Sequence, residues 1–155
     1  MQFVAGSSKS STETGTIGAG ASDMNADEKK SLVLDTWHAI AAGEVRVAFA
    51  NLTDDVRWKI PGNISPISGV KNGKSEILAF LHAVSKIFPP GMSSEIRAAY
   101  VDGDIVVLEM VNRSRTASGR PYENEYCFVF EIADGKIREI REYVDTERAR
   151  EIILG

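Results

Sequence analysis

The sequence predicts an α+β fold in which a curved antiparallel β-sheet wraps around N-terminal helices and forms a cone with an internal apolar cavity. Before Pro89, most apolar residues recur at helical spacing, whereas from Glu95 to Val144 they alternate with a period of two. Helices followed by a run of long strands are typical of α+β domains, in which the helices cover one face of a sheet.

The composition fits one globular domain with no obvious macromolecular partner. A chain of 155 residues with 43% hydrophobic residues is long enough to bury its own core. Its 18 basic and 22 acidic residues are mixed along the chain, so nucleic acid is not expected as a partner. No stretch approaches the roughly 18 apolar residues of a membrane span, so no membrane association is expected. The single cysteine, Cys127, cannot form an internal disulfide, and a cytoplasmic location fits it best.

The first residues predict a disordered tail. Residues 1–24 are dominated by Gly, Ser, Thr and Ala, which offer too little apolar surface to offset the entropy of ordering them. The single folded domain is therefore expected to span residues 25–155.

The domain is expected to begin with a helix. Asn25 followed three positions later by Glu28 is the pattern of a capping box, and Gly43 is a natural C-terminal stop. Trp37 lies on the apolar stripe of this helix, whereas His38 faces solvent and is a poor catalytic candidate.

A second helix and a first strand are expected next. Apolar residues at helical spacing from Val45 to Leu52 predict a short helix that ends at the turn residues Asp54-Asp55. Residues 56–60 alternate and predict a strand, which places Trp58 and Ile60 on its apolar face.

Residues 69–75 imitate a phosphate-binding loop but lack its spacing, so they predict a helix start near Asn72 or Gly73 instead. The apolar stripe of this third helix continues to Phe88, and His82 lies on its opposite side.

The remaining chain is expected to form long strands. One strand around residues 96–100 turns at Asp102-Gly103-Asp104 into a second strand that runs from Ile105 to about Thr116. Both faces of the second strand are partly apolar, which predicts that a second copy of the chain covers the outer face and forms a homodimer. The residues expected at that interface are Val107, Val111 and Val129.

A hairpin from Tyr122 to Asp145 organises the fold. Asp134-Gly135 is a strong signal for a tight turn, and the residues on both sides alternate with a period of two. This alternation places Glu142 on the same face as the phenylalanines, where burial disfavours its charge. No later core helix is expected, and only a short terminal helix is predicted over residues 147–154.

Several short motifs occur in an order that is fairly specific in combination. They are Ala41-Ala42-Gly43-Glu44, Asp54-Asp55-Val56-Arg57-Trp58, Ser68-Gly69, Gly73-Lys74, Gly119-Arg120-Pro121-Tyr122, Asp134-Gly135-Lys136-Ile137 and Arg141-Glu142-Tyr143-Val144-Asp145. With them, the chain from Asp27 to Asp145 resembles the nuclear transport factor 2-like superfamily, particularly its SnoaL-like polyketide cyclase and ketosteroid isomerase-like members. The resemblance implies a cystatin-like α+β barrel but does not fix the reaction.

The comparison with ketosteroid isomerases is informative because this chain lacks their catalytic residues at the matching positions. Where those enzymes have a carboxylate base this chain has Ile60, and where they have a tyrosine on the first helix it has Thr36. The position of their protonated aspartic acid falls near Tyr126.

Limonene epoxide hydrolases are similar over the same span, and the resemblance points to one acid. Their Asp-Arg-Asp set would need arginine at Met110 and aspartate at Asn112, and only the third acid is matched, by Glu142. In SnoaL-like cyclases the acid/base aspartate also falls at Glu142. Glu142 is therefore the one ionisable position that the resemblance retains.

The candidate catalytic residues are Glu142, Asn112 and Tyr126. Asn112 and Tyr126 either position a substrate oxygen or orient Glu142, or else they satisfy buried backbone groups. The expected cavity walls are Trp37, Trp58, Ile60, Leu108, Met110, Tyr122 and Phe128.

Two classes of function remain open. The first is an isomerase, cyclase or hydrolase that uses Glu142 as general acid/base on a small hydrophobic substrate, with no cofactor and no metal. The second is a non-catalytic binding protein for a hydrophobic small molecule. They are distinguished by whether Glu142 has a polar partner in the cavity.

Overall fold

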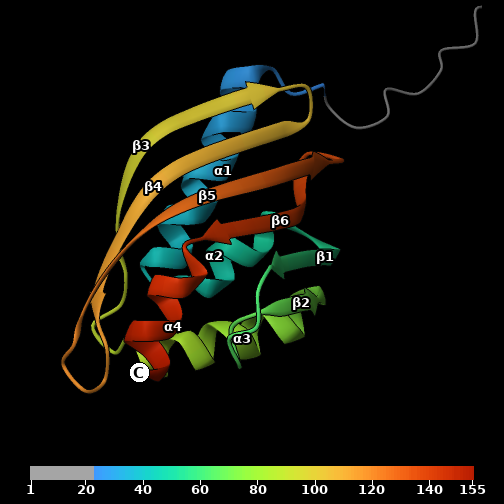
Figure 1. Ribbon diagram of the computed structural model, residues 1–155. Helices are drawn as coiled ribbons and strands as arrows, with labels where there is room; N and C mark the ends of the chain where they lie inside the picture. Colours follow the sequence, from blue (N-terminus) through green and yellow to red (C-terminus); the bar gives the residue numbers. More distant parts are fainter. Residues whose placement is uncertain (1–22) are drawn as a thin grey trace, which may run out of the picture.

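The computed structural model describes residues 23–155, in which a curved six-stranded sheet packs against helices (Figure 1). In chain order the elements are α1 (Ala26–Ala41), α2 (Val45–Ala50), β1 (Leu52–Ile60), β2 (Gly69–Asn72), α3 (Gly73–Ile87), β3 (Ser93–Asp102), β4 (Ile105–Arg115), β5 (Pro121–Ala133), β6 (Lys136–Val144) and α4 (Thr146–Leu154). The predicted disordered tail lies outside the described residues except for Asp23 and Met24, and Met24 already packs against the core.

The predicted α+β fold is confirmed, and the sheet has one parallel pairing. The strand order is β2-β1-β6-β5-β4-β3, and every neighbouring pair is antiparallel except β1 with β6. The long strands β3 to β5 curve over α1 (Figure 1). The sheet is not closed, because β2 and β3 remain its two edges, so the cone is an open one.

The predicted start of α1 and the predicted orientation of its apolar stripe are confirmed. Asn25 Oδ1 accepts a hydrogen bond from the Glu28 backbone N–H, and the Glu28 carboxylate accepts one from the Asn25 N–H, which completes the capping box. Trp37 is buried and His38 is exposed, as the helical stripe predicts.

The prediction that the second helix reaches Leu52 and ends at Asp54-Asp55 is wrong. Helix α2 ends at Ala50, and Leu52 opens a nine-residue strand that includes both aspartates. The reason is a long-range pairing: the Ile137 N–H donates to the Asn51 carbonyl, and fully buried Leu52 lies opposite Ile137. Tertiary pairing thus overrides the local helical spacing.

Strand β2 was not expected from the sequence. Its four residues pair antiparallel with the end of β1, so that Lys71 lies opposite Trp58. The helix that follows does begin at Gly73 with Asn72 as its N-cap residue, and the Glu76 carboxylate accepts from the Asn72 N–H.

The hairpin of β5 and β6 places the acidic candidate. Asp134 and Gly135 have φ values of 53° and 72°, so both central residues adopt the left-handed conformation that a type I′ turn requires. The resulting register sets Glu142 opposite Phe128 on the buried face of the sheet.

Helix α4 is part of the apolar interior, although only a short terminal helix outside the core was predicted. Asp145 caps it by accepting from the Arg148 N–H. Its Ala149 is buried in a second apolar cluster with Ile64, Phe88 and Tyr122. The expectation that no later helix joins the core is therefore wrong, because α4 closes part of the interior beside α3.

Candidate functional site

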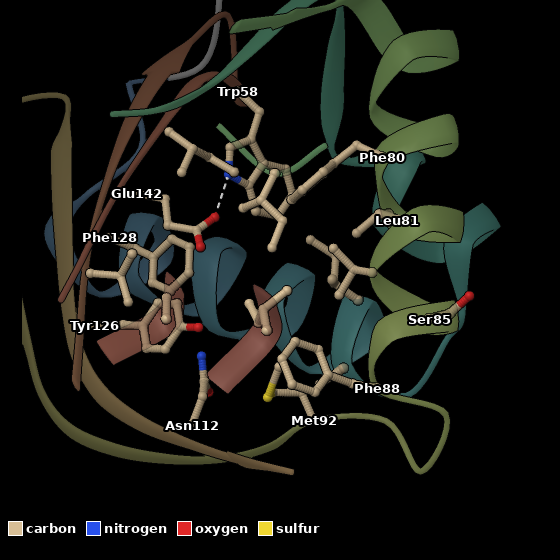
Figure 2. Close-up of a pocket in the computed structure, with 18 of the residues that line it drawn as sticks. Trp58, Phe80, Leu81, Ser85, Phe88, Met92, Asn112, Tyr126, Phe128 and Glu142 are labelled. Carbon is tan, nitrogen blue, oxygen red and sulfur yellow. Dashed lines mark hydrogen bonds between the residues drawn. The ribbon is translucent and has the colours of Figure 1, made fainter. Parts of the chain in front are cut away.

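A cavity of about 370 Å³ lies between the concave face of the sheet and the helices (Figure 2). Helix α1 lines it with Trp37, α3 with Phe80 and Leu81, and α4 with Ala149 and Ile153. The sheet contributes the remaining predicted wall residues that reach it, namely Trp58, Ile60, Tyr122 and Phe128. The lining is mainly apolar, which suits a hydrophobic ligand.

Leu108 and Met110 do not line this cavity, contrary to expectation. Both are almost completely buried in the main core cluster. They do point to the inner face of β4, as alternation predicts, but helix and sheet side chains close over that part of the face. The alternation thus predicted correctly that both side chains lie on the inner face of the sheet. It could not show which part of that face borders the cavity.

The cavity wall around Phe128 is aromatic. The Phe128 ring lies 4.5 Å from the Trp37 ring centroid, 5.6 Å from Tyr126 in a stacked arrangement, and 6.4 Å from Trp58. Trp58 in turn meets Phe80 of α3 edge-on at 5.3 Å. Such contacts hold rigid, flat walls around the acid.

Glu142 lies inside this aromatic shell. It is 7% exposed, and its Oε2 accepts a 2.9 Å hydrogen bond from the Trp58 indole Nε1 (Figure 2). Burial raises the pKa of the Glu142 carboxyl from its ordinary 4.5 to about 7, although the Trp58 hydrogen bond and the positive charge of Lys71 both act to lower this pKa. The carboxyl is therefore present in both protonation states near neutral pH.

Lys71 is a residue of the site that sequence reasoning missed. It is 8% exposed on β2, its Nζ donates to the Ile67 carbonyl, and its ammonium lies 4.5 Å from the centre of the Phe80 ring. Desolvation lowers the pKa of Lys71, and the charge of Glu142 acts in the opposite direction. The pairing of β2 with β1, which brings Lys71 near the acid, has no local signal in the sequence beyond a Gly-rich loop.

Tyr126 and Tyr122 form a hydroxyl pair beside the acid. Their oxygens are 2.6 Å apart, and the Asn124 Nδ2 donates to the Tyr122 hydroxyl at 3.2 Å and to the Asp145 carbonyl at 2.9 Å. Desolvation raises the pKa of both phenols, and the negative charge of Glu142 raises them further. Both tyrosines are therefore neutral hydrogen-bonding groups at neutral pH.

Asn112, the third candidate, lies on β4 and is 2% exposed. Its Oδ1 accepts a 2.6 Å hydrogen bond from Ser94 Oγ, which itself accepts from Trp37 Nε1 at 3.1 Å. The structure thus brings Asn112, Tyr126 and Glu142 to one cavity, where all three are lining residues.

The raised pKa of Glu142 predicts a loss of stability with rising pH. The unfolded chain releases this proton near pH 4.5 and the folded chain near pH 7, so the contribution of Glu142 is most favourable below pH 4.5 and declines as pH rises to 7. A pKa raised from 4.5 to about 7 corresponds to about 3 kcal/mol in the free energy of unfolding. Urea denaturation between pH 4.5 and 8 measures it.

The control for this prediction is the Glu142→Gln variant, which has no proton to release. Surface carboxylates such as Glu95, whose pKa is lowered by its hydrogen bond with Arg113, impose the opposite trend on both proteins at the acidic end of this range. Only the difference between the two stability curves isolates Glu142. Parallel curves for the two proteins over this pH range would contradict the buried, half-ionised state.

Within residues 23–155, no group of three or more His, Cys, Asp or Glu side chains is arranged to hold a metal ion. In that same part of the chain, no helix has the length and apolar character needed to cross a membrane. His82, like His38, is exposed.

The fold resembles several solved structures. An NTF2-like protein of unknown function from Burkholderia pseudomallei K96243 is 22% identical with a TM-score of 0.78, covering 85% of this chain and 100% of that one. TerC, co-crystallised with polyporic acid, is 21% identical with a TM-score of 0.76, covering 83% of this chain and 99% of that one. An LEH-like epoxide hydrolase from M. tuberculosis is 21% identical with a TM-score of 0.65, covering 83% of this chain and 90% of that one.

Sequence comparison identifies the family. No curated protein matches the chain. The sequence profile described as the SnoaL-like domain matches residues 33–140, which is well over half of the chain and includes β1 to β5 and most of β6 up to Ile140. The chain belongs to the SnoaL-like domain family.

Proposed function

We propose that the protein is an enzyme that moves a proton on a small hydrophobic substrate, with Glu142 as general acid/base and without a cofactor. The observation that carries the proposal is a carboxyl group with a pKa of about 7 inside an apolar cavity. General acid/base catalysis is most efficient when the pKa of the catalytic group lies near the working pH. Glu142 therefore suits either direction of proton transfer.

The proposed reaction is an isomerisation, cyclisation or hydrolysis. Each of these needs a proton to be taken from or given to carbon or oxygen, which one carboxyl group in an apolar cavity is able to do. The epoxide hydrolase from M. tuberculosis and TerC with polyporic acid have related folds, which supports chemistry on small organic molecules in such a cone.

A non-catalytic binding protein is the second candidate. The binding function is favoured by Ile60 and Met110, because related enzymes have ionisable residues at these two positions and this chain has apolar ones. The position of Trp58 favours the enzyme, because its indole N–H gives Glu142 the polar partner that distinguishes the two functions. A simple hydrophobic binder gains nothing from a buried carboxyl group.

The experiment that tests the proposal is a screen of small apolar ketones, enones and epoxides in deuterated buffer, followed by NMR. Product formation or exchange of carbon-bound hydrogen by the unmodified chain, and its loss in the Glu142→Gln variant, would support the enzyme. Ligand binding without conversion in either protein would support the binder.

We also propose that two copies of the chain pair through the outer face of the sheet. Val107 and Val129 lie opposite each other on this face and are only half-buried, and Tyr143, which lies opposite Cys127, is 44% exposed. Val111, predicted at the same surface, is already buried within one copy. An interface of about 800 Å² per copy would give a stable dimer. Sedimentation at micromolar concentration is expected to show two-chain particles, and a purely monomeric boundary would refute the pairing.

A further inference from the structure

The side-chain amide of Asn112 has two ends in different surroundings. Its oxygen accepts from Ser94 at 2.6 Å, whereas among residues 23–155 its Nδ2 has no hydrogen-bond acceptor within reach and is not one of the fully enclosed unpaired atoms, of which Thr53 Oγ1 is the example. The nitrogen points into the cavity, on the same side as the Tyr126 hydroxyl (Figure 2). A residue that is 2% exposed therefore presents a free N–H donor to the hollow interior.

Two neighbours fix the direction of this amide. The Trp37 indole N–H is only a donor, so Ser94 Oγ must accept from it at 3.1 Å. The single hydroxyl proton of Ser94 then goes to its other neighbour, which must be an acceptor and is Asn112 Oδ1. If the amide were flipped, its NH₂ group would face Ser94 Oγ. The Ser94 hydroxyl would then have donors on both sides, and its own proton would have no acceptor. The relay from Trp37 through Ser94 thus holds the Asn112 NH₂ toward the cavity.

The relay is built on rigid elements. Ser94 and Asn112 lie directly opposite each other in the β3–β4 pairing, and the Trp37 ring packs against Phe128. Side chains held by packing and by a second hydrogen bond keep a binding group in place better than loop residues do. The amide direction is therefore set before any ligand enters.

The Tyr122–Tyr126 hydroxyl pair supplies a second donor. The two oxygens are 2.6 Å apart and either hydroxyl can donate to the other, while the Tyr122 oxygen also accepts from Asn124 Nδ2. When Tyr122 donates to Tyr126, the Tyr126 proton is available to the cavity. Asn112 and Tyr126 together favour an acceptor atom and disfavour a donor at this place.

We propose that Asn112, positioned by Ser94 and Trp37, binds an acceptor oxygen of the ligand with the help of Tyr126. The ligand is accordingly an apolar molecule with a carbonyl or ether oxygen directed at the β4–β5 wall, while Glu142 faces another part of it. The inference rests on the proposed function for the use of this cavity, but it concerns binding selectivity and not turnover.

A matched pair of probes tests the inference. 2-Acetylnaphthalene and 2-isopropenylnaphthalene share their shape and differ in a C=O against a C=CH₂ group. Their affinities are measured by quenching of tryptophan fluorescence, and the quantity of interest is the ratio of ketone to hydrocarbon affinity. Asn112→Leu is expected to lower this ratio roughly three- to tenfold, the effect of one neutral hydrogen bond.

Variants of Ser94 test the positioning role. Ser94→Ala leaves Asn112 in place but frees its amide to turn, so the ratio should fall in part, and Ser94→Thr, which keeps the hydroxyl, should restore it. Ser85→Ala is the control, because Ser85 also lines the cavity but donates to the His82 carbonyl of its own helix. This control should leave the ratio unchanged.

The outcomes separate this inference from the catalytic proposal. An unchanged ratio in Asn112→Leu, or in Ser94→Ala if the former does not fold, would overturn the inference. Glu142→Gln should keep the ratio, so a normal ratio with unaltered turnover in that variant would reject only the catalytic role. Failure of both probes to bind the unmodified chain would reject the cavity as a site for such ligands and the inference with it.

Discussion

Replacing Glu142 by glutamine is expected to reduce turnover by about 100-fold or more while ligand affinity stays within about threefold. Glutamine keeps the shape of the side chain, and its carbonyl oxygen still accepts the hydrogen bond that Trp58 donates. It has no transferable proton, so only the step that moves a proton is lost. The measurement is kcat and KM on a substrate found by screening, together with a binding constant for the same compound.

A matched control lies three positions earlier on the same strand. Glu139 pairs with Arg141 at 2.8 Å on the outer face of the sheet, so Glu139→Gln should leave turnover intact. The dependence of kcat/KM on pH should also lose its inflection near pH 7 in Glu142→Gln. Equal turnover in the unmodified chain and Glu142→Gln would show that the acid takes no part in the reaction.

Removing the Phe128 ring is expected to cost about 3 to 5 kcal/mol of unfolding free energy. Phe128 is 1% exposed and contacts rings from α1, β1 and its own strand, including Trp37, Trp58 and Phe130. Alanine at this position leaves a void that aromatic neighbours on three elements are too rigid to fill. Guanidinium denaturation of Phe128→Ala against the unmodified chain measures the loss.

Tyr143→Ala is the comparison for this substitution, since it removes a ring of similar size from the neighbouring strand at a position that is 44% exposed. Its cost should remain near the roughly 0.5 kcal/mol typical of surface changes, provided that both variants are measured below the concentration at which copies pair. A loss below about 1 kcal/mol for Phe128→Ala would mean that the aromatic wall is not tightly packed.

The parts of the fold that follow from local chemistry were predictable from the sequence. The Asp134-Gly135 turn and the alternation on both of its sides determine the hairpin, and with it the inward direction of Glu142. The capping box at Asn25 and Glu28 likewise determines where α1 begins. In each case the residues that carry the signal are neighbours in the chain.

The parts that depend on pairing between distant segments were not predictable. Leu52 fits the spacing of α2 as well as that of β1, and only Ile137 on β6 decides between them. Lys71 lies near the acid because β2 pairs with β1, and the Gly-rich loop before β2 gives no local sign of this pairing. The partnership of Ser94 with Asn112 similarly needs the exact register of β3 on β4, which alternation alone leaves open.

The parallel pairing of β1 with β6 has a consequence for how the protein folds. The hairpin of β5 and β6 closes over a two-residue turn, but the hydrogen bond from Trp58 to Glu142 joins positions 84 residues apart. Contacts of such sequence separation carry a large loop-closure cost and are expected late in folding. The raised pKa of Glu142 comes from burial by several elements, whereas the hydrogen bond from Trp58 of β1 acts to lower it. Glu142 therefore acquires its final acidity only when the whole shell around it has assembled, with β1 placed beside the last strand.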